Sequence, residues 1–139
     1  MALKLQIRGL PEMEARLKRM AAAAPIASKR ALVRQAEFVM TDSKANYCPV
    51  KDGHLRASGH VAVDPRAIAV TWSYGGPAGT GQNRQDVGYA IPQHEILTYQ
   101  HTVGEAEYLK RPLEKAVGGG MGSAIAGEVS DALEAEARR

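Results

Sequence analysis

Two histidines and a glutamate form the most reactive group of side chains in the sequence. His94 and Glu95 are adjacent and His101 follows, and imidazole and carboxylate groups serve as metal ligands and as acid–base groups. A zinc-protease helix needs H-E-x-x-H, and Thr98 stands where the second histidine would be. His94, Glu95 and His101 are still a candidate ligand set for a metal-dependent hydrolase. The generic spacing favours the simpler interpretation, in which both histidines hydrogen-bond to backbone or to a neighbouring subunit.

Nucleophilic and phosphate-binding chemistry find little support. Cys48 is the single cysteine, so neither an intramolecular disulfide nor a cysteine-rich zinc site is expected. No catalytic motif surrounds it, and we expect it to be buried. Residues 75–88 are rich in glycine but lack the G-x-x-x-x-G-K-[ST] pattern. This long segment is predicted to be an arm that becomes ordered against a partner, and no cofactor is expected.

The composition is that of an ordinary globular chain. A length of 139 residues predicts one domain, with 45% hydrophobic and 24% charged residues. Aromatic residues, at 5%, are too few for a platform on which single-stranded nucleic acid would stack. We find no signal peptide and no apolar run long enough to cross a bilayer, so we expect a protein of the reducing cytoplasm without a membrane partner.

The formal charge of +3 is unevenly distributed along the chain. Residues 1–34 hold eight basic and two acidic residues, a net +6, whereas residues 123–139 hold four acidic and two basic ones, a net −2. Such an asymmetry favours contact with DNA or with an acidic partner, although a solvated helix face would look the same.

The N-terminal third of the chain predicts a strand and two helices. Leu3, Leu5 and Ile7 alternate with polar residues, which indicates a half-buried strand ended by Gly9. A helix is expected from Pro11 to about residue 24, where Pro25 interrupts it. A second helix is predicted over 26–47, ending before Pro49 because a residue that precedes proline is displaced from the helical region. Its expected inner face comprises Leu32, Ala36, Val39 and Ser43.

The remaining sequence predicts a hairpin, a further strand and two helices. Alternating residues over 61–63 and 68–74, joined by an Asp-Pro-Arg turn, are typical of an antiparallel hairpin. A third strand is expected over 87–91 and a helix over about 105–117, in which Pro112 predicts either a kink or a later start. After a glycine-rich break, Ser123 would cap the last helix. These elements predict an α+β fold, an antiparallel sheet of about four strands with a long helix and shorter helices packed on one face.

Three stretches carry a resemblance to a known family. They are the segment ANYCPVKDGHLRAS over 45–58, the pair Tyr89-Ala90 followed by His94-Glu95, and the segment HTVGEAEYL over 101–109 that continues into Arg111-Pro112-Leu113. In this order and spacing they resemble the head–tail joining, or tail-completion, proteins in the neck of long-tailed bacteriophages. The resemblance covers residues 26–117. It implies a core over 26–117, preceded by a strand and short helix over 1–25 and followed by a linker and helix over 118–139.

The resemblance implies a structural virion protein without enzymatic activity. Copies would form a ring of about six where capsid and tail meet. Expected partners are other neck, connector and tail proteins, with DNA in the lumen as a further option, after assembly in the host cytoplasm. A non-specific DNA-binding protein is the alternative outside this family. Residues expected to specify the fold are Pro49, Gly53, Leu55, Gly104, Leu109 and Pro112. Residues expected at subunit boundaries are Arg56, Gly79, Arg84, Asp86, His94, Glu95, His101 and Tyr108.

Overall fold

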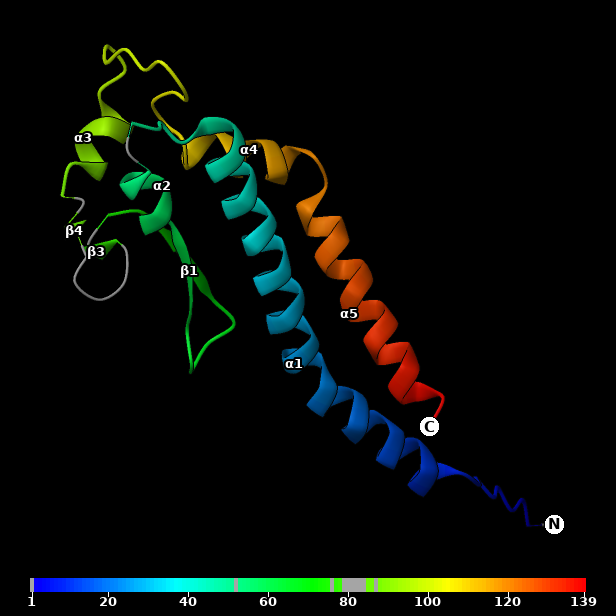
Figure 1. Cartoon of the computed structure of the whole chain (residues 1–139). Coiled ribbons are helices and arrows are strands. Elements are labelled where there is room, and N and C mark those ends of the chain that lie inside the picture. The colour runs from blue at the N-terminus through cyan, green and yellow to red at the C-terminus, as the bar shows by residue number, and fades with distance from the viewer. Residues whose placement is uncertain (1, 52, 76, 79–84, 87) are drawn as a thin grey trace.

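The computed structural model describes residues 2–51, 53–75, 77–78, 85–86 and 88–139. Helices dominate this part of the chain (Figure 1). The helices are α1 (Leu10–Asp42), a π-helical turn η1 (Ser43–Tyr47), α2 (His54–Ser58), α3 (Ala90–Glu95), α4 (Lys110–Gly118) and α5 (Met121–Ala137). The strands are β1 (His60–Val63), β2 (Val70–Ser73), β3 (Pro77–Ala78) and β4 (Gln85–Asp86). They form two separate two-stranded pairs, so the predicted sheet of about four strands is wrong.

Helix α1 is a single rod through Pro25, where the sequence predicted a break. Proline removes one backbone hydrogen bond, to the carbonyl of Ala21, but both Ala21 and Pro25 are exposed, so water can satisfy that carbonyl. The alanines at 21–24 strongly favour helix on the preceding turn. The expected strand before α1 is also absent, since residues 2–9 have no regular structure. The predicted division at residue 25 therefore does not match the structure.

Helix α5 packs antiparallel along α1 and forms a helical hairpin with it (Figure 1). The chain turns between α4 and α5 at Gly120, whose φ of 100° lies in the left-handed region that glycine tolerates. Helix α5 starts at Met121, two residues before the predicted cap at Ser123. Arg34 of α1 pairs with Glu128 of α5 at 3.5 Å. Part of the positive charge near the N-terminus is therefore paired, within the chain, with negative charge near the C-terminus.

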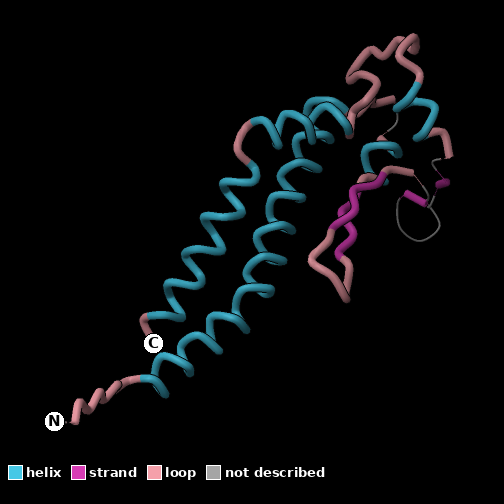
Figure 2. Tube along the Cα trace, turned by 180° about the vertical axis from the view of Figure 1, so that it is seen from behind, coloured by secondary structure: helices cyan, strands magenta, loops and turns pink. Residues whose placement is uncertain are grey.

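The predicted β-hairpin is confirmed. Strands β1 and β2 pair antiparallel with Val61 opposite Trp72 and Val63 opposite Val70. The hairpin lies against the second half of α1, and its tip points back along the helix (Figure 2). The ammonium group of Lys29 on α1 donates a hydrogen bond to the carbonyl oxygen of Asp64 at this tip. The hairpin therefore lies beside the part of α1 that runs from Lys29 toward the C-terminal end of the helix.

Residues around 90 form a helix where a third strand was predicted. Tyr89, Ile91 and Pro92 fit a strand edge in isolation, but Pro92 lies in the first turn of α3, where a missing N–H costs nothing. Ala90 is buried and receives a hydrogen bond from the hydroxyl of Tyr108, 2.7 Å away. Among the described residues β1 and β2 pair only with each other, and residues around 90 do not join them.

The helix predicted from about Glu105 starts later, which is one of the two outcomes expected from Pro112. Residues 106–109 form a turn, and α4 begins at Lys110. Pro112 lies in the first turn of α4 and is buried, so it starts the helix and does not kink it. Leu109 is the residue that precedes α4 and is half-buried.

A junction between two distant segments holds this end of the molecule together. The N–H of Val50 donates to the carbonyl of Val103 at 3.3 Å, and the N–H of Glu105 donates to that of Tyr47 at 2.8 Å. Gly104 lies between them with φ 84°, and a Cβ there would approach the backbone nitrogen of Pro49 to 2.5 Å. Only glycine fits this position, as its predicted role in the fold requires.

The core beside this junction is built around Tyr108. Its ring meets the ring of Tyr74 edge to face, with centroids 4.9 Å apart. The Ser43 hydroxyl lies 2.7 Å from the Tyr74 hydroxyl and also donates to the carbonyl of Tyr108. Cys48 and Leu55 complete the buried cluster. Leu55 enters the core, and Gly53, at φ 84°, makes the turn that precedes α2 and not, as expected, a turn directly into a strand.

Candidate functional site

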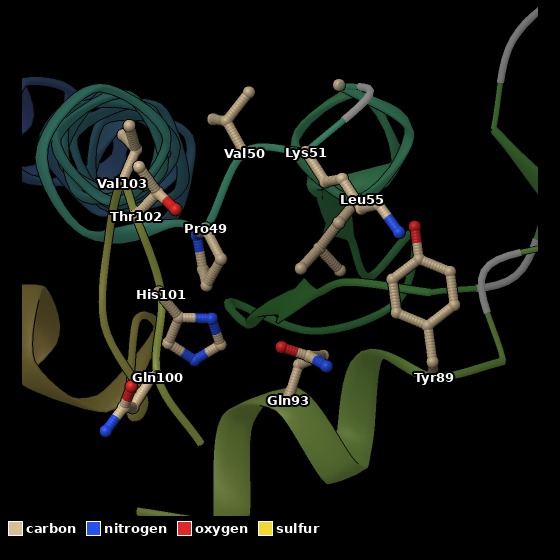
Figure 3. A pocket seen from close by; sticks show the side chains of 11 residues that line it. Pro49, Val50, Lys51, Leu55, Tyr89, Gln93, Gln100, His101, Thr102 and Val103 are labelled. Carbon is tan, nitrogen blue, oxygen red and sulfur yellow. The ribbon is translucent and has the colours of Figure 1, made fainter.

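The junction forms one wall of a pocket of about 560 Å³. Three segments line it: the stretch from Pro49 to Leu55, the start of α3 with Tyr89 and Gln93, and residues 100–103. Figure 3 shows the side chains of His101 and Gln93 pointing into the space below Pro49. Sequence motifs that lie about fifty residues apart therefore meet at one site.

His101 gives this pocket an unusual polar group. Its Nε2 atom is buried and has no hydrogen-bond partner among the residues that the structure describes. A buried polar atom without a partner costs free energy, and a donor or acceptor brought by a bound molecule would relieve that cost. Lys51 supplies an ammonium group at the rim, and Leu55 and Val103 supply apolar contacts. The pocket is suited to a side chain or short segment that combines an apolar body with a polar tip.

The metal-ligand alternative does not fit this geometry. His94 Nδ1 lies 2.6 Å from Glu95 Oε1, and the two form an ion pair at the end of α3 when the histidine is protonated. His101 lines the pocket instead. Within the described residues no three His, Cys, Asp or Glu side chains gather as a metal site would need. His94, Glu95 and His101 therefore do not form the ligand set that a hydrolase would require.

Cys48 is buried, as the sequence predicted, and its surroundings keep it protonated. Removal from water raises the pKa of its thiol to about 11. Because the thiolate is the reactive form, a thiol with this pKa is a poor nucleophile at neutral pH. Cys48 is therefore a packing residue of the junction.

The residues predicted at subunit boundaries fall into four groups. His94, Glu95 and His101 line accessible surfaces of α3 and of the pocket. Tyr108 is 1% exposed and belongs to the core, whereas Arg56 is partly enclosed, with a buried Nε that has no partner among the described residues. Asp86 pairs with Pro77 through the backbone of β4. Gly79 and Arg84 lie outside the described residues.

A second surface was missed by the sequence analysis. Leu3, Leu5 and Ile7 are 98%, 84% and 63% exposed, although their alternation predicted a half-buried strand. The exposed stripe continues along the first turns of α1 through Leu10, Met13 and Leu17. We call residues 3–17 the N-terminal apolar stripe. Its alternation was visible in the sequence, but the absence of a partner within the chain was not.

The basic residues of α1 are partly engaged within the molecule. Lys18 pairs with Glu14 at 2.7 Å, Arg34 with Glu128, and Lys29 with the backbone of the hairpin. This reduces the positive surface available to a polyanion and weakens the DNA-binding alternative. No helix in the described ranges has the length and hydropathy needed to cross a bilayer.

The chain matches no protein-family model, and neither the curated proteins nor the solved structures include a significant match to it.

Proposed function

We propose that this protein is a structural component of a long-tailed bacteriophage virion, and that its copies form a ring at the head–tail joint. The ring would connect the portal side of the capsid to the tail. The resemblance over residues 26–117 supports this assignment, because the residues that carry it shape the fold of the chain. Pro49 follows the last helical turn, Gly104 permits the junction, and Leu55 fills the core.

The observation that carries the proposal is the amount of surface that one chain leaves exposed. The accessible surface is 9768 Å², whereas a compact monomer of 14.9 kDa exposes about 7,000 Å². Much of the excess comes from an elongated shape in which α1 and its preceding segment extend beyond α5 (Figures 1 and 2). A chain of this shape would bury its excess surface against neighbouring molecules.

Two groups of exposed apolar side chains lie at the two ends of the molecule, and others, such as Ile26 and Phe38, lie along α1 between them. One group is the N-terminal apolar stripe, and the other comprises Ile91 on α3 with Leu97 and Val103 in the following loop. The second group adjoins the pocket that holds His101. A protomer of a connecting ring needs two different surfaces. One contacts copies of the same chain, and the other contacts a ring made of a different protein. In this scheme the pocket and its rim bind the adjoining neck or tail protein.

Native mass spectrometry of the purified chain, combined with negative-stain electron microscopy, tests the proposal. We expect a closed multimer with a central opening. Leu17→Asp within the stripe should dissociate it, whereas Arg16→Ala on the neighbouring polar side should leave it intact. A chain that stays monomeric at every concentration, or an antibody label found away from the neck of the assembled particle, would contradict the proposal.

A further inference from the structure

Residues 3–7 have the side-chain pattern of a strand but no sheet to join. Leu3, Leu5 and Ile7 would share one face, and Lys4 and Gln6 the other. The three apolar side chains are mostly exposed, and residues 2–9 make none of the backbone hydrogen bonds of a sheet in the structure. We propose that this segment pairs as a strand with the free edge of the β1–β2 hairpin in a second copy of the chain.

The hairpin is an incomplete sheet that can accept such a strand. It has two strands of four residues each, and each has one edge without a strand neighbour among the described residues. Helix α1 covers one face of this hairpin, and an added strand would supply further backbone hydrogen bonds and apolar cover at its edge. Val63 and Ile68, at 43% and 50% exposure, lie at the hairpin tip where an incoming apolar face would cover them.

The length of α1 prevents this pairing within one chain. The hairpin lies beside α1 from the level of Lys29 upward, and Lys29 is about 29 Å along the helix from Leu10. Fully extended, the chain from Leu10 back to Leu5 spans at most about 18 Å. The segment also points away from the hairpin in both views (Figures 1 and 2). While α1 remains continuous, the partner must therefore be the hairpin of another copy.

This exchange joins two different patches, the segment on one copy and the hairpin on the next. Such a contact is heterologous, and repeated copies related by a closing rotation form a ring. The inference thus deepens the proposed function and rests on it, because it names the element through which neighbouring copies hold each other.

Cysteine cross-linking between separately purified variants tests the exchange. Gln6 would lie on the same face of the extended sheet as Ala62 and Thr71, which are paired with each other and exposed. Gln6→Cys protein is mixed with Ala62→Cys protein, which reports on the edge of β1, or with Thr71→Cys protein, which reports on the edge of β2. The mixture that tests the edge accepting the strand should give a disulfide-linked heterodimer. Gln6→Cys mixed with Ser130→Cys, an exposed site on α5, is the control and should not cross-link.

Two further measurements separate the possible failures. Deleting residues 2–9 removes no buried side chain, so the fold should persist by circular dichroism while the multimer dissociates. If the intact chain assembles but neither edge cross-links and the deletion variant still assembles, strand exchange is wrong and the ring proposal stands. If a Gln6→Cys/Ala62→Cys or Gln6→Cys/Thr71→Cys double variant links only within its own chain, α1 has opened and the exchange is also wrong. If the intact chain never assembles, the proposed function itself fails.

Discussion

The indole Nε1 of Trp72 donates a hydrogen bond to the backbone carbonyl of Ala36 at a distance of 2.9 Å. Trp72 is the half-buried centre of β2, and Ala36 is fully buried in the middle of α1. The bond fixes where along the helix the hairpin lies, because a backbone carbonyl cannot move without moving the helix. Together with the contact of Lys29 at the tip, it sets the hairpin parallel to the long axis of α1.

Trp72→Phe should therefore destabilise the fold mainly by the loss of this hydrogen bond. The aromatic body is largely kept, so we expect a decrease of about 1 kcal/mol in the free energy of unfolding. Urea denaturation followed by circular dichroism measures it. Thr71→Val, at the neighbouring exposed position on the opposite face, should change stability by less than about 0.5 kcal/mol. Equal effects for the two variants would show that the bond does not anchor the hairpin.

Gly104→Ala should be among the most damaging single substitutions in the chain. It combines a positive φ with a Cβ forced against the backbone of Pro49, and we expect a loss of at least about 2 kcal/mol. Gly120→Ala is the matched control, since Gly120 also has a positive φ but open space around it. That variant should lose only about 1 kcal/mol in the same denaturation experiment. Similar losses would mean that conformational strain, and not the junction, explains Gly104.

The buried thiol of Cys48 predicts a loss of stability at alkaline pH. Its pKa rises from an ordinary value of 9.0 to about 11 in the folded protein because of burial. A raised pKa stabilises the fold below pH 9, and this contribution, at most roughly 3 kcal/mol, is lost between about pH 9 and 11. The free-energy difference between wild type and Cys48→Ala should shrink over that window. A difference independent of pH would show that the thiol is not desolvated.

His101 should matter for assembly and not for the stability of the monomer. Its buried Nε2 makes no hydrogen bond within the described part of the chain, so His101→Leu should change the free energy of unfolding by less than about 0.5 kcal/mol. Leu55→Ala, on another wall of the same pocket, should cost about 3 kcal/mol because Leu55 is a core side chain. Chemical denaturation of both variants checks the contrast. A large loss for His101→Leu would indicate a hydrogen bond in the folded monomer.

Prolines and the alternation of apolar residues over short stretches made part of the fold predictable. Pro49 ends a helix because of its own ring, and the alternation around Trp72 specifies a hairpin within a few residues. The errors arose where an element needs a neighbour. Residues 3–7 alternate as a strand does, yet no strand of the described chain lies beside them. Ala90 and Ile91 form the first turn of α3, although their alternation with Tyr89 suggested a strand.

The candidate site was predictable only in fragments. His101 and Gly53 were each singled out from their own motifs, but the pocket between them depends on the closure around Gly104. That closure joins segments separated by about fifty residues, and no local pattern encodes such a distance.

Pro25 divides α1 into two lengths with different attachments. The inner length carries the hairpin and the Tyr108 core, whereas the outer length carries the exposed side chains of Met13 and Leu17. With one backbone bond missing between them, the outer length can tilt at a lower energetic cost than bending elsewhere in the rod would require. A neighbour that pulls on the outer length can thus adjust its direction while the inner length and everything attached to it stay in place.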